Sequence, residues 1–291
     1  ADSEDELVSS RGGARTEVPD TLDAQMVVDA RLALENGSKM QLSYNVENTQ
    51  RAIGTRLSSH IVRRFGMTGL REGHILVRLR GSAGQSLGAF ATQGLRLDVI
   101  GDANDYVGKG LSGGMIVVRP SAAVGFVASA NTIIGNTVLY GATSGKLFAA
   151  GQAGERLCVR NSGATAVVEG SGSNACEYMT GGNVVILGEV GDNFGAGMTG
   201  GMAFIYDEAG NFESRVNRES LQLFRIAHPH WENKLRDLVA EHARETESAL
   251  AARILNQWEK ALQNFWQVVP TEIIPVLDVP LKLEDDLSET A

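Results

Sequence analysis

Cysteine, proline and long apolar runs are scarce in this chain, and each scarcity excludes a class of protein. With two cysteines and six prolines among 291 residues, the chain does not resemble a small secreted domain held together by disulfides, and we expect a reducing, cytoplasmic environment. No apolar run is long enough to span a membrane, and no signal peptide is visible. We therefore expect no membrane partner.

Charge of one sign is also missing from the body of the chain. The formal net charge is −9, but the two ends carry eight of the 35 acidic residues. The remaining charges nearly balance, so the sequence lacks the basic surface that indicates nucleic-acid binding. Residues 1–20 are acidic and contain serine and glycine, which predicts a linker.

Glycine is abundant, with 34 residues, and most of it marks a repeat. From Val138 onward, a step of about 19 residues lays short apolar segments over one another without a gap. Upstream, Ile75–Arg80, Leu95–Ile100 and Met115–Arg119 continue the repeat, and an irregular insert, Ser121–Asn131, interrupts it. Because one short strand per unit cannot bury a core alone, the copies must stack.

Stacked strands with glycines at the corners predict an all-β solenoid core, a right-handed single-stranded parallel β-helix flanked by α-helices. We expect this core to span residues 75–207. Residues 21–74 would then form an N-terminal helical cap, residues 208–269 C-terminal helices, and residues 270–291 an extended tail.

The flanking regions give more detailed expectations. The N-terminal part predicts a helix over Leu22–Glu35, a strand over Met40–Val46, and a second helix that Asn48 or Thr49 caps and that runs to Phe65. After Asp207 the apolar pattern becomes helical, beginning near Leu221 and Phe224. A long helix from about Glu247 would carry one apolar stripe, formed by Leu250, Ile254, Trp258, Ala261 and Phe265.

The repeat also predicts which strand residues face outward. Alternate side chains in a strand point to opposite faces, so taking the positions of Leu147 and Ala149 as inward leaves the position between them outward. At the expected spacing, that outward column is Phe148, Val167, Ile186 and Ile205. Because four stacked apolar side chains are not left in water, we expect a cover. The candidates are the chain's own terminal helices and a neighbouring domain of a larger protein, and we favour the first because it needs only residues of this chain.

Two segments, Gly108–Gly113 and Gly195–Gly200, fit the dinucleotide-binding pattern G-x-G-x-x-G. That fingerprint needs a strand before it and a helix after it, whereas apolar strand segments follow both motifs here. We therefore interpret them as corners of the repeat, and Lys109 has no P-loop partner. The expected structural turn glycines are Gly108, Gly110, Gly113, Gly114, Gly181, Gly182, Gly195, Gly197, Gly200 and Gly201.

No catalytic, cofactor-binding or metal-binding residue is predicted. Cys158 and Cys176 are too few for an iron–sulfur cluster. His228 and His230 flank a proline before a helix and have no further ligand nearby, so they mark a turn. Asp102 and Asp105 could belong to a polysaccharide-cleaving β-helix but are interpreted as turn residues. His60, His74 and His242 have no visible nucleophile partner.

Long blocks of the sequence closely resemble the carboxy-terminal domain of the glutamate synthase large (alpha) chain, often called the GXGXG domain. The resemblance runs from about residue 20 to Pro270. It departs at Ser173 and Asn174, where the family often has Asp-His. The blocks that carry it are Asn48–Gly54, Gly81–Ser86, Gly101–Gly114, Gly135–Thr143, Val159–Gly163, Cys176–Gly182 and Gly195–Gly201.

The resemblance implies a function that the residues alone do not show. The full enzyme of this family converts glutamine, 2-oxoglutarate and NADPH into two glutamates. Its large chain has a cysteine amidotransferase domain and a synthase domain with FMN and a 3Fe–4S cluster, and a small FAD-containing subunit accepts the electrons of NADPH. In the family, the β-helix has no catalytic residue and holds the other domains apart, so the fragment alone is expected to be inactive.

Two other interpretations stay open. One is a free-standing GXGXG subunit, as in archaeal-type glutamate synthases or formylmethanofuran dehydrogenase. The other, which the sequence supports least, is a carbohydrate-active β-helix, for which an acidic groove is missing. The acidic ends and the flanking helices match the bacterial fusion better than a separate subunit.

Overall fold

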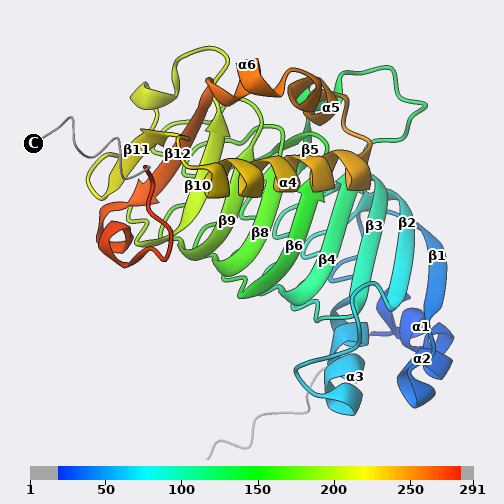
Figure 1. Ribbon diagram of the computed structural model, residues 1–291. Coiled ribbons are helices and arrows are strands. Elements are labelled where there is room, and N and C mark those ends of the chain that lie inside the picture. Colours follow the sequence, from blue (N-terminus) through cyan, green and yellow to red (C-terminus); the bar gives the residue numbers. More distant parts are fainter. Residues whose placement is uncertain (1–18, 283–291) are drawn as a thin grey trace, which may run out of the picture.

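The computed structural model describes residues 19–282. Within these residues, twelve strands form one sheet, and ten of them follow each other in the order β1-β2-β3-β4-β6-β8-β9-β10-β12-β11. Pairing is parallel from β1 to β10. The N-terminal helices lie beside the first strands, and helix α4 lies across one face of the stack (Figure 1). The structure is thus a mostly parallel β-sheet with flanking helices.

The strands of the stack coincide with the predicted strand Met40–Val46 and with the apolar segments of the repeat. Their residue ranges are β1 Met40–Val46, β2 Ile75–Ala83, β3 Leu95–Ala103, β4 Ser112–Arg119, β6 Ser144–Ala149, β8 Ser162–Val168, β9 Thr180–Ile186 and β10 Gly200–Tyr206. Two short strands, β5 (Thr132–Ile134) and β7 (Gln152–Ala153), pair with each other beside this series, and isolated bridges from Ala153 to Ser171 and from Ser171 to Val190 continue their line.

The N-terminal helices differ from the expectation at two points. The predicted Leu22–Glu35 helix is two helices, α1 (Leu22–Asp29) and α2 (Arg31–Asn36), which meet at Ala30. The second predicted helix, α3, spans Thr55–Phe65 and begins after Gly54 rather than at Asn48 or Thr49. The N–H groups at the start of α3 are hydrogen-bonded by a residue distant in the sequence. The buried Asp23 carboxylate accepts from Gly54 N (3.0 Å) and from Arg56 N.

The C-terminal region contains strands as well as helices. Leu221–Arg225 forms β11 and Phe265–Pro270 forms β12, which pairs antiparallel with both β10 and β11. The long helix is α4 (Pro229–Thr246), which ends at Glu247 in a left-handed conformation (φ 59°). The predicted helix from Glu247 is therefore wrong: its stripe is divided among α5 (Ala249–Asn256), α6 (Trp258–Leu262) and β12.

Three short 3-10 helices complete the described chain. They span Ala128–Ala130, Phe212–Ser214 and Thr271–Val276. The last of these lies in the predicted extended tail, whose residues 283–291 fall outside the described part. Residues 1–18 of the predicted linker also fall outside it.

Two apolar clusters lie on opposite faces of the strands. The inner cluster contains Leu147, Ala149, Ile186 and Ile205, and the outer cluster lies between the sheet and the C-terminal helices. Helix α4 crosses the outer face of strands β4 to β10 (Figure 1). The outer cluster includes Phe148, Val167, Val185 and Phe204 from the strands, and Trp231, Leu235, Val239, Ile254 and Trp258 from the helices.

The predicted outward column is correct for its first two members and wrong for the next two. Phe148 and Val167 face the outer cluster, but Ala166 pairs with Val184 rather than with the expected Val185. An irregularity between Ser162 and Thr165 absorbs one residue at this step. Since the side-chain period of a strand is two, that slip turns Ile186 and Ile205 inward and places Val185 and Phe204 outward.

The expected cover by the chain's own C-terminal helices is confirmed. Val167 and Ile186 are both 0% exposed, but for different reasons. Val167 belongs to the outer cluster beneath the C-terminal helices, and Ile186 belongs to the inner cluster. Ile254, Trp258, Ala261 and Phe265 of the predicted stripe belong to the cover. Helix α4 also contributes Trp231, Leu235 and Val239, although the cover was expected from the apolar stripe after Glu247.

Candidate functional site

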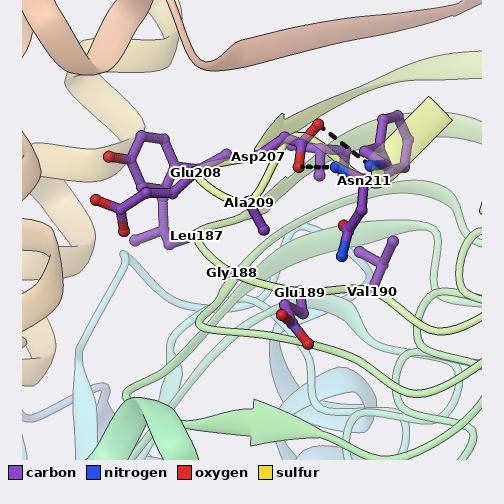
Figure 2. Close-up of a pocket in the computed structure, with 11 residues that line it drawn as sticks. Leu187, Gly188, Glu189, Val190, Asp207, Glu208, Ala209 and Asn211 are labelled. Carbon is purple, nitrogen blue, oxygen red and sulfur yellow. Dashed lines mark hydrogen bonds between the residues drawn. The ribbon is translucent and has the colours of Figure 1, made fainter.

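A pocket of about 280 Å³ opens at the last turns of the stack, where the segments after β9 and β10 meet. Figure 2 shows its carboxylates, Glu189, Asp207 and Glu208. Asp207 accepts hydrogen bonds from Asn211 N (2.9 Å), Phe212 N (3.2 Å) and Trp266 Nε1 (3.1 Å). Its charge is therefore used to hold the turn and β12 together.

The second carboxylate of this pocket is also paired. Arg253 donates to both oxygens of Glu208, at 3.0 Å each, and these hydrogen bonds hold the pKa of Glu208 below its ordinary value. None of the residues that line the pocket is a histidine, cysteine, serine or lysine. Two of its three carboxylates, Asp207 and Glu208, are held by hydrogen bonds to other parts of the chain, which gives them a structural role here.

Both G-x-G-x-x-G motifs lie at the same corner of the stack, four turns apart, and are followed by strands, β4 and β10. Their first glycines have left-handed backbone, with φ 65° at Gly108 and 71° at Gly195. The N–H of Gly108 donates to Leu87 O in the preceding turn (2.8 Å), and the N–H of Gly110 donates to Tyr140 O in the next (2.8 Å). The motifs thus join turns, and the helix N-terminus that a pyrophosphate needs does not follow them.

Sequence reasoning missed that every turn adopts this corner conformation, with or without glycine. Leu139, Cys158 and Cys176 occupy the position of Gly108 with φ of 58°, 59° and 58°. Each donates its N–H to the preceding turn, as Gly108 does. The recurring element is therefore a backbone conformation, and glycine is one of several residues that fill it.

The ten predicted turn glycines fall into two groups. Seven have positive φ, and three do not: Gly114, Gly181 and Gly200. At these three positions glycine is needed because a neighbouring turn lies too close to leave room for a Cβ atom. A Cβ at Gly181 would lie 2.2 Å from Ser162 O, and one at Gly200 would lie 2.1 Å from Thr180 O. The seven with positive φ are Gly108, Gly110, Gly113, Gly182, Gly195, Gly197 and Gly201.

The two cysteines are stacked in neighbouring turns and are inert. Both are fully buried. Burial raises the pKa of both thiols, and the nearby Cys176 raises that of Cys158 further. Two protonated, buried thiols do not fit the three or four thiolates that an iron–sulfur cluster requires.

The remaining candidates have local structural roles. His228 caps α4 by accepting from His230 N through Nδ1 (3.1 Å), as the turn interpretation predicted. Asp105 accepts from Asn136 N in the next turn (2.7 Å), and Asp102, at the end of β3, accepts from Ser82 (3.1 Å). Between residues 19 and 282, no three side chains of the metal-binding types gather into a possible metal site.

His60 and His74 lie near the N-terminal helices, and Lys109 lies at the corner edge. His74 Nε2 contacts Gly37 O, and His60 faces the space between α2 and α3. Lys109 lies 5.7 Å from the ring centroid of Tyr106.

A buried polar cluster, which no local sequence signal indicates, fastens the α4–α5 junction to the sheet. Glu169, just after β8, is 2% exposed and accepts a hydrogen bond from Ser248, which in turn caps Ala251 N of α5 (3.0 Å). His242 of α4 is fully buried, with Nε2 3.6 Å from Glu169 Oε1. The residue types match a hydrolytic triad, but Glu169 lies between Ser248 and His242, so no histidine contacts the serine hydroxyl.

Beside this cluster, an ion pair joins the end of α4 to β3. Arg96 Nη1 donates to Glu245 Oε2 (2.6 Å), and Arg96 also pairs with Asp98. Burial raises the pKa of Glu245, but the hydrogen bond and charge of Arg96 outweigh this effect and leave the pKa below its ordinary value.

This lowered pKa predicts how the contact depends on pH. The Glu245 carboxylate stabilises the fold above its unfolded pKa of about 4.3, and this contribution is lost as pH falls through the lower folded pKa. We expect Glu245→Gln to reduce the free energy of unfolding by about 1 kcal/mol at neutral pH, with no difference in strong acid. Denaturant unfolding at a series of pH values measures this.

The matched control is Glu247→Gln. Glu247 also pairs with an arginine, Arg119, but its side chain is 69% exposed, so its removal should change stability little. A Glu245→Gln deficit that stays constant from neutral to acid pH would contradict the assignment.

Comparison with known proteins identifies the family of this chain. The family model for the GXGXG motif matches residues 23–271. The chain is 64% identical to the glutamate synthase [NADPH] large chain of Azospirillum brasilense over 274 residues, which cover 94% of this chain and 18% of that protein. It is 48% identical to the ferredoxin-dependent glutamate synthase of Pyropia yezoensis, covering 85% of this chain and 16% of that protein.

A third relative is ferredoxin-dependent glutamate synthase 1 of Arabidopsis thaliana, 47% identical over 86% of this chain and 15% of that protein. The chain therefore spans less than a fifth of the length of these relatives. None of the helices formed by residues 19–282 combines the length and apolar character needed to cross a bilayer. The chain belongs to the GXGXG motif family and corresponds to one region of a glutamate synthase large chain.

Proposed function

We propose that this chain is a non-catalytic scaffold domain of an NADPH-dependent glutamate synthase. The observation that carries the proposal is the match over 94% of the chain to an NADPH-type large chain. The lower identities to the ferredoxin-dependent enzymes, 48% and 47%, favour the NADPH type. Buried thiols, paired carboxylates and a serine hydroxyl with no histidine beside it support a non-catalytic role.

The shape proposed for the scaffold is a right-handed parallel β-helix. The parallel series β1 to β10, the second line of bridges through β5 and β7, and the hydrogen-bonded corners support three lines of contact per turn. Residues 75–207 form the β-helix in this proposal, residues 21–74 its N-terminal cap, and residues 208–269 its C-terminal cover. Residues 1–20 and 270–291 act as connections.

In the proposed setting, the chain works beside catalytic domains of the same polypeptide. The amidotransferase domain and the synthase domain with FMN and a 3Fe–4S cluster supply the chemistry, and a small subunit passes electrons from NADPH through FAD. The residues described above hold none of these groups. This chain contributes a stiff body that keeps the two domains at a fixed separation in the cytoplasm. The much greater length of the relatives favours this fusion over a free-standing subunit.

We expect the purified 291-residue chain to be colourless and to form no glutamate from glutamine and 2-oxoglutarate. The physical reason is that its two cysteines are buried and protonated, and that Asp207, Glu208 and Glu169 hold hydrogen bonds within the fold. Absorbance spectroscopy and a glutamate assay with NADPH measure this. A flavin or iron–sulfur band that remains with the folded chain after gel filtration would contradict the proposal.

A further inference from the structure

Three large aromatic side chains are exposed along the corner edge of the stack, on residues with left-handed backbone. Phe90 (φ 57°) is 56% exposed, Tyr106 (φ 62°) is 40% exposed, and Tyr178 (φ 53°) is 53% exposed. The fold sets this backbone conformation at every corner, but bulky residues seldom adopt positive φ, so large rings are not the side chains that the conformation favours. Exposure of a large ring to water adds a second unfavourable contribution.

Two of these rings lie against the second glycine of a G-x-G motif in the next turn. A Cβ at Gly110 would lie 2.5 Å from a ring carbon of Phe90, and a Cβ at Gly197 would lie 2.5 Å from Cδ1 of Tyr178. The backbones are joined at the same points, since Phe90 N donates to Lys109 O (2.8 Å) and Tyr178 N to Ala196 O (2.9 Å). The aromatic ring of each residue therefore packs against the backbone of a motif glycine, where a side chain would clash with it.

The corner itself does not require an aromatic residue. Gly141 and Arg160 occupy the same position in other turns, with φ of 62° and 54°, and make the corresponding hydrogen bonds to Val159 O (3.3 Å) and Glu177 O (2.9 Å). Glycine at positions 90 and 178 would serve the fold without strain. The rings therefore have a role outside the fold of this domain.

We propose that Phe90 and Tyr178, each resting on a motif glycine, anchor this domain to another domain of the same longer chain. The inference rests on the proposed function. Four turns separate the two rings, which is about 19 Å at the usual strand spacing. That separation fits within one side of a standard protein interface. The outer face of the sheet is already covered by α4, so it is not free for this contact.

The chemistry of the edge describes the partner surface. Tyr106 with the nearby Lys109, and the exposed Arg160, lie between the two rings. A surface that offers apolar contact for the rings and carboxylates for these cations matches this edge. Since 82% of the Azospirillum brasilense large chain lies outside the region matched here, the polypeptide itself contains enough further structure to supply that surface.

Hydroxyl-radical footprinting of the full-length large chain tests the proposal. Phe90 and Tyr178 should be oxidised several-fold more slowly than Phe126, which is the matched control because it is 45% exposed in this domain and lies on the insert. Equal rates for Phe90 and Phe126 would overturn the proposal. Slow oxidation of Phe126 alone would also overturn it, while leaving the scaffold role in place. If no exposed residue of the domain were protected, the scaffold role itself would fail.

A second arm uses Phe90→Gly combined with Tyr178→Gly in the full-length chain. These changes relieve backbone strain, so the domain should remain folded while limited proteolysis releases it several-fold faster. Phe126→Ala should not change the release rate. Unchanged release in the double variant would overturn the proposal. Protection of the two rings that depends on enzyme concentration would assign the edge to a second copy, which also overturns it.

Discussion

Gly201→Val is expected to destabilise this domain strongly. Gly201 has φ 78°, and a Cβ there would lie 2.6 Å from Met179 Cε and 2.8 Å from both Gly181 C and Gly182 O. The positive φ alone costs about 1 kcal/mol for a residue with a Cβ, and forcing a branched side chain against backbone adds about 1–3 kcal/mol. For a domain of this size, we expect Tm to fall by roughly 5–15 °C, which scanning calorimetry measures.

Two control substitutions separate the causes. Gly210 also has positive φ (71°) but has no atom within 4 Å of a built Cβ, and Gly125 has neither positive φ nor a close neighbour. Gly210→Ala should therefore show only the conformational loss, and Gly125→Ala should change Tm little. If Gly201→Val and Gly210→Ala lowered Tm equally, close packing between turns would have no part in the requirement for glycine.

Phe148→Ala is expected to loosen the C-terminal cover. Phe148 is 0% exposed, lies on the outer face of β6, and has its ring centroid 6.1 Å from that of His242 in α4. Removing a buried phenylalanine costs about 3–5 kcal/mol, because the helix cannot collapse fully into the cavity. All three tryptophans, Trp231, Trp258 and Trp266, lie in α4, α6 and β12, so their fluorescence reports on the cover directly.

We expect the tryptophan transition of the Phe148→Ala variant to occur at lower denaturant concentration than that of the parent. Phe90→Ala in the isolated chain is the matched control, because its ring is 56% exposed and should leave the transition nearly unchanged. Equal effects of the two substitutions would show that α4 does not depend on the outer face of the sheet.

The regular part of the fold could be predicted from the sequence because its signals are local. Short apolar segments between glycines indicated the strands, and seven of them coincide with β2, β3, β4, β6, β8, β9 and β10. The C-terminal strands β11 and β12 were missed. A short apolar run such as Leu221–Arg225 or Phe265–Pro270 fits a helical stripe and a strand equally well. The antiparallel pairing of β12 with β10 is what shows that Phe265–Pro270 is a strand.

The features of the candidate site also fall into a group that the sequence could predict and a group that it could not. The glycine motifs were visible, and their interpretation as corners followed from the strand segments after them. The shared left-handed corner in turns without glycine was not visible, since Leu139 and Cys158 carry no sequence mark of positive φ. The contact of Glu169 with His242 and Ser248 was equally hidden, because it joins residues that are distant in sequence.

The sequence by itself therefore determined the family, the parallel stack and the existence of an apolar outward column that must be covered. Tertiary structure alone decided which residues form that column and what covers it. The reason is that side chains alternate along a strand, so the single residue absorbed between Ser162 and Thr165 exchanges the two faces of every later strand. No local pattern records that exchange, and the position of α4 follows from the apolar face that results.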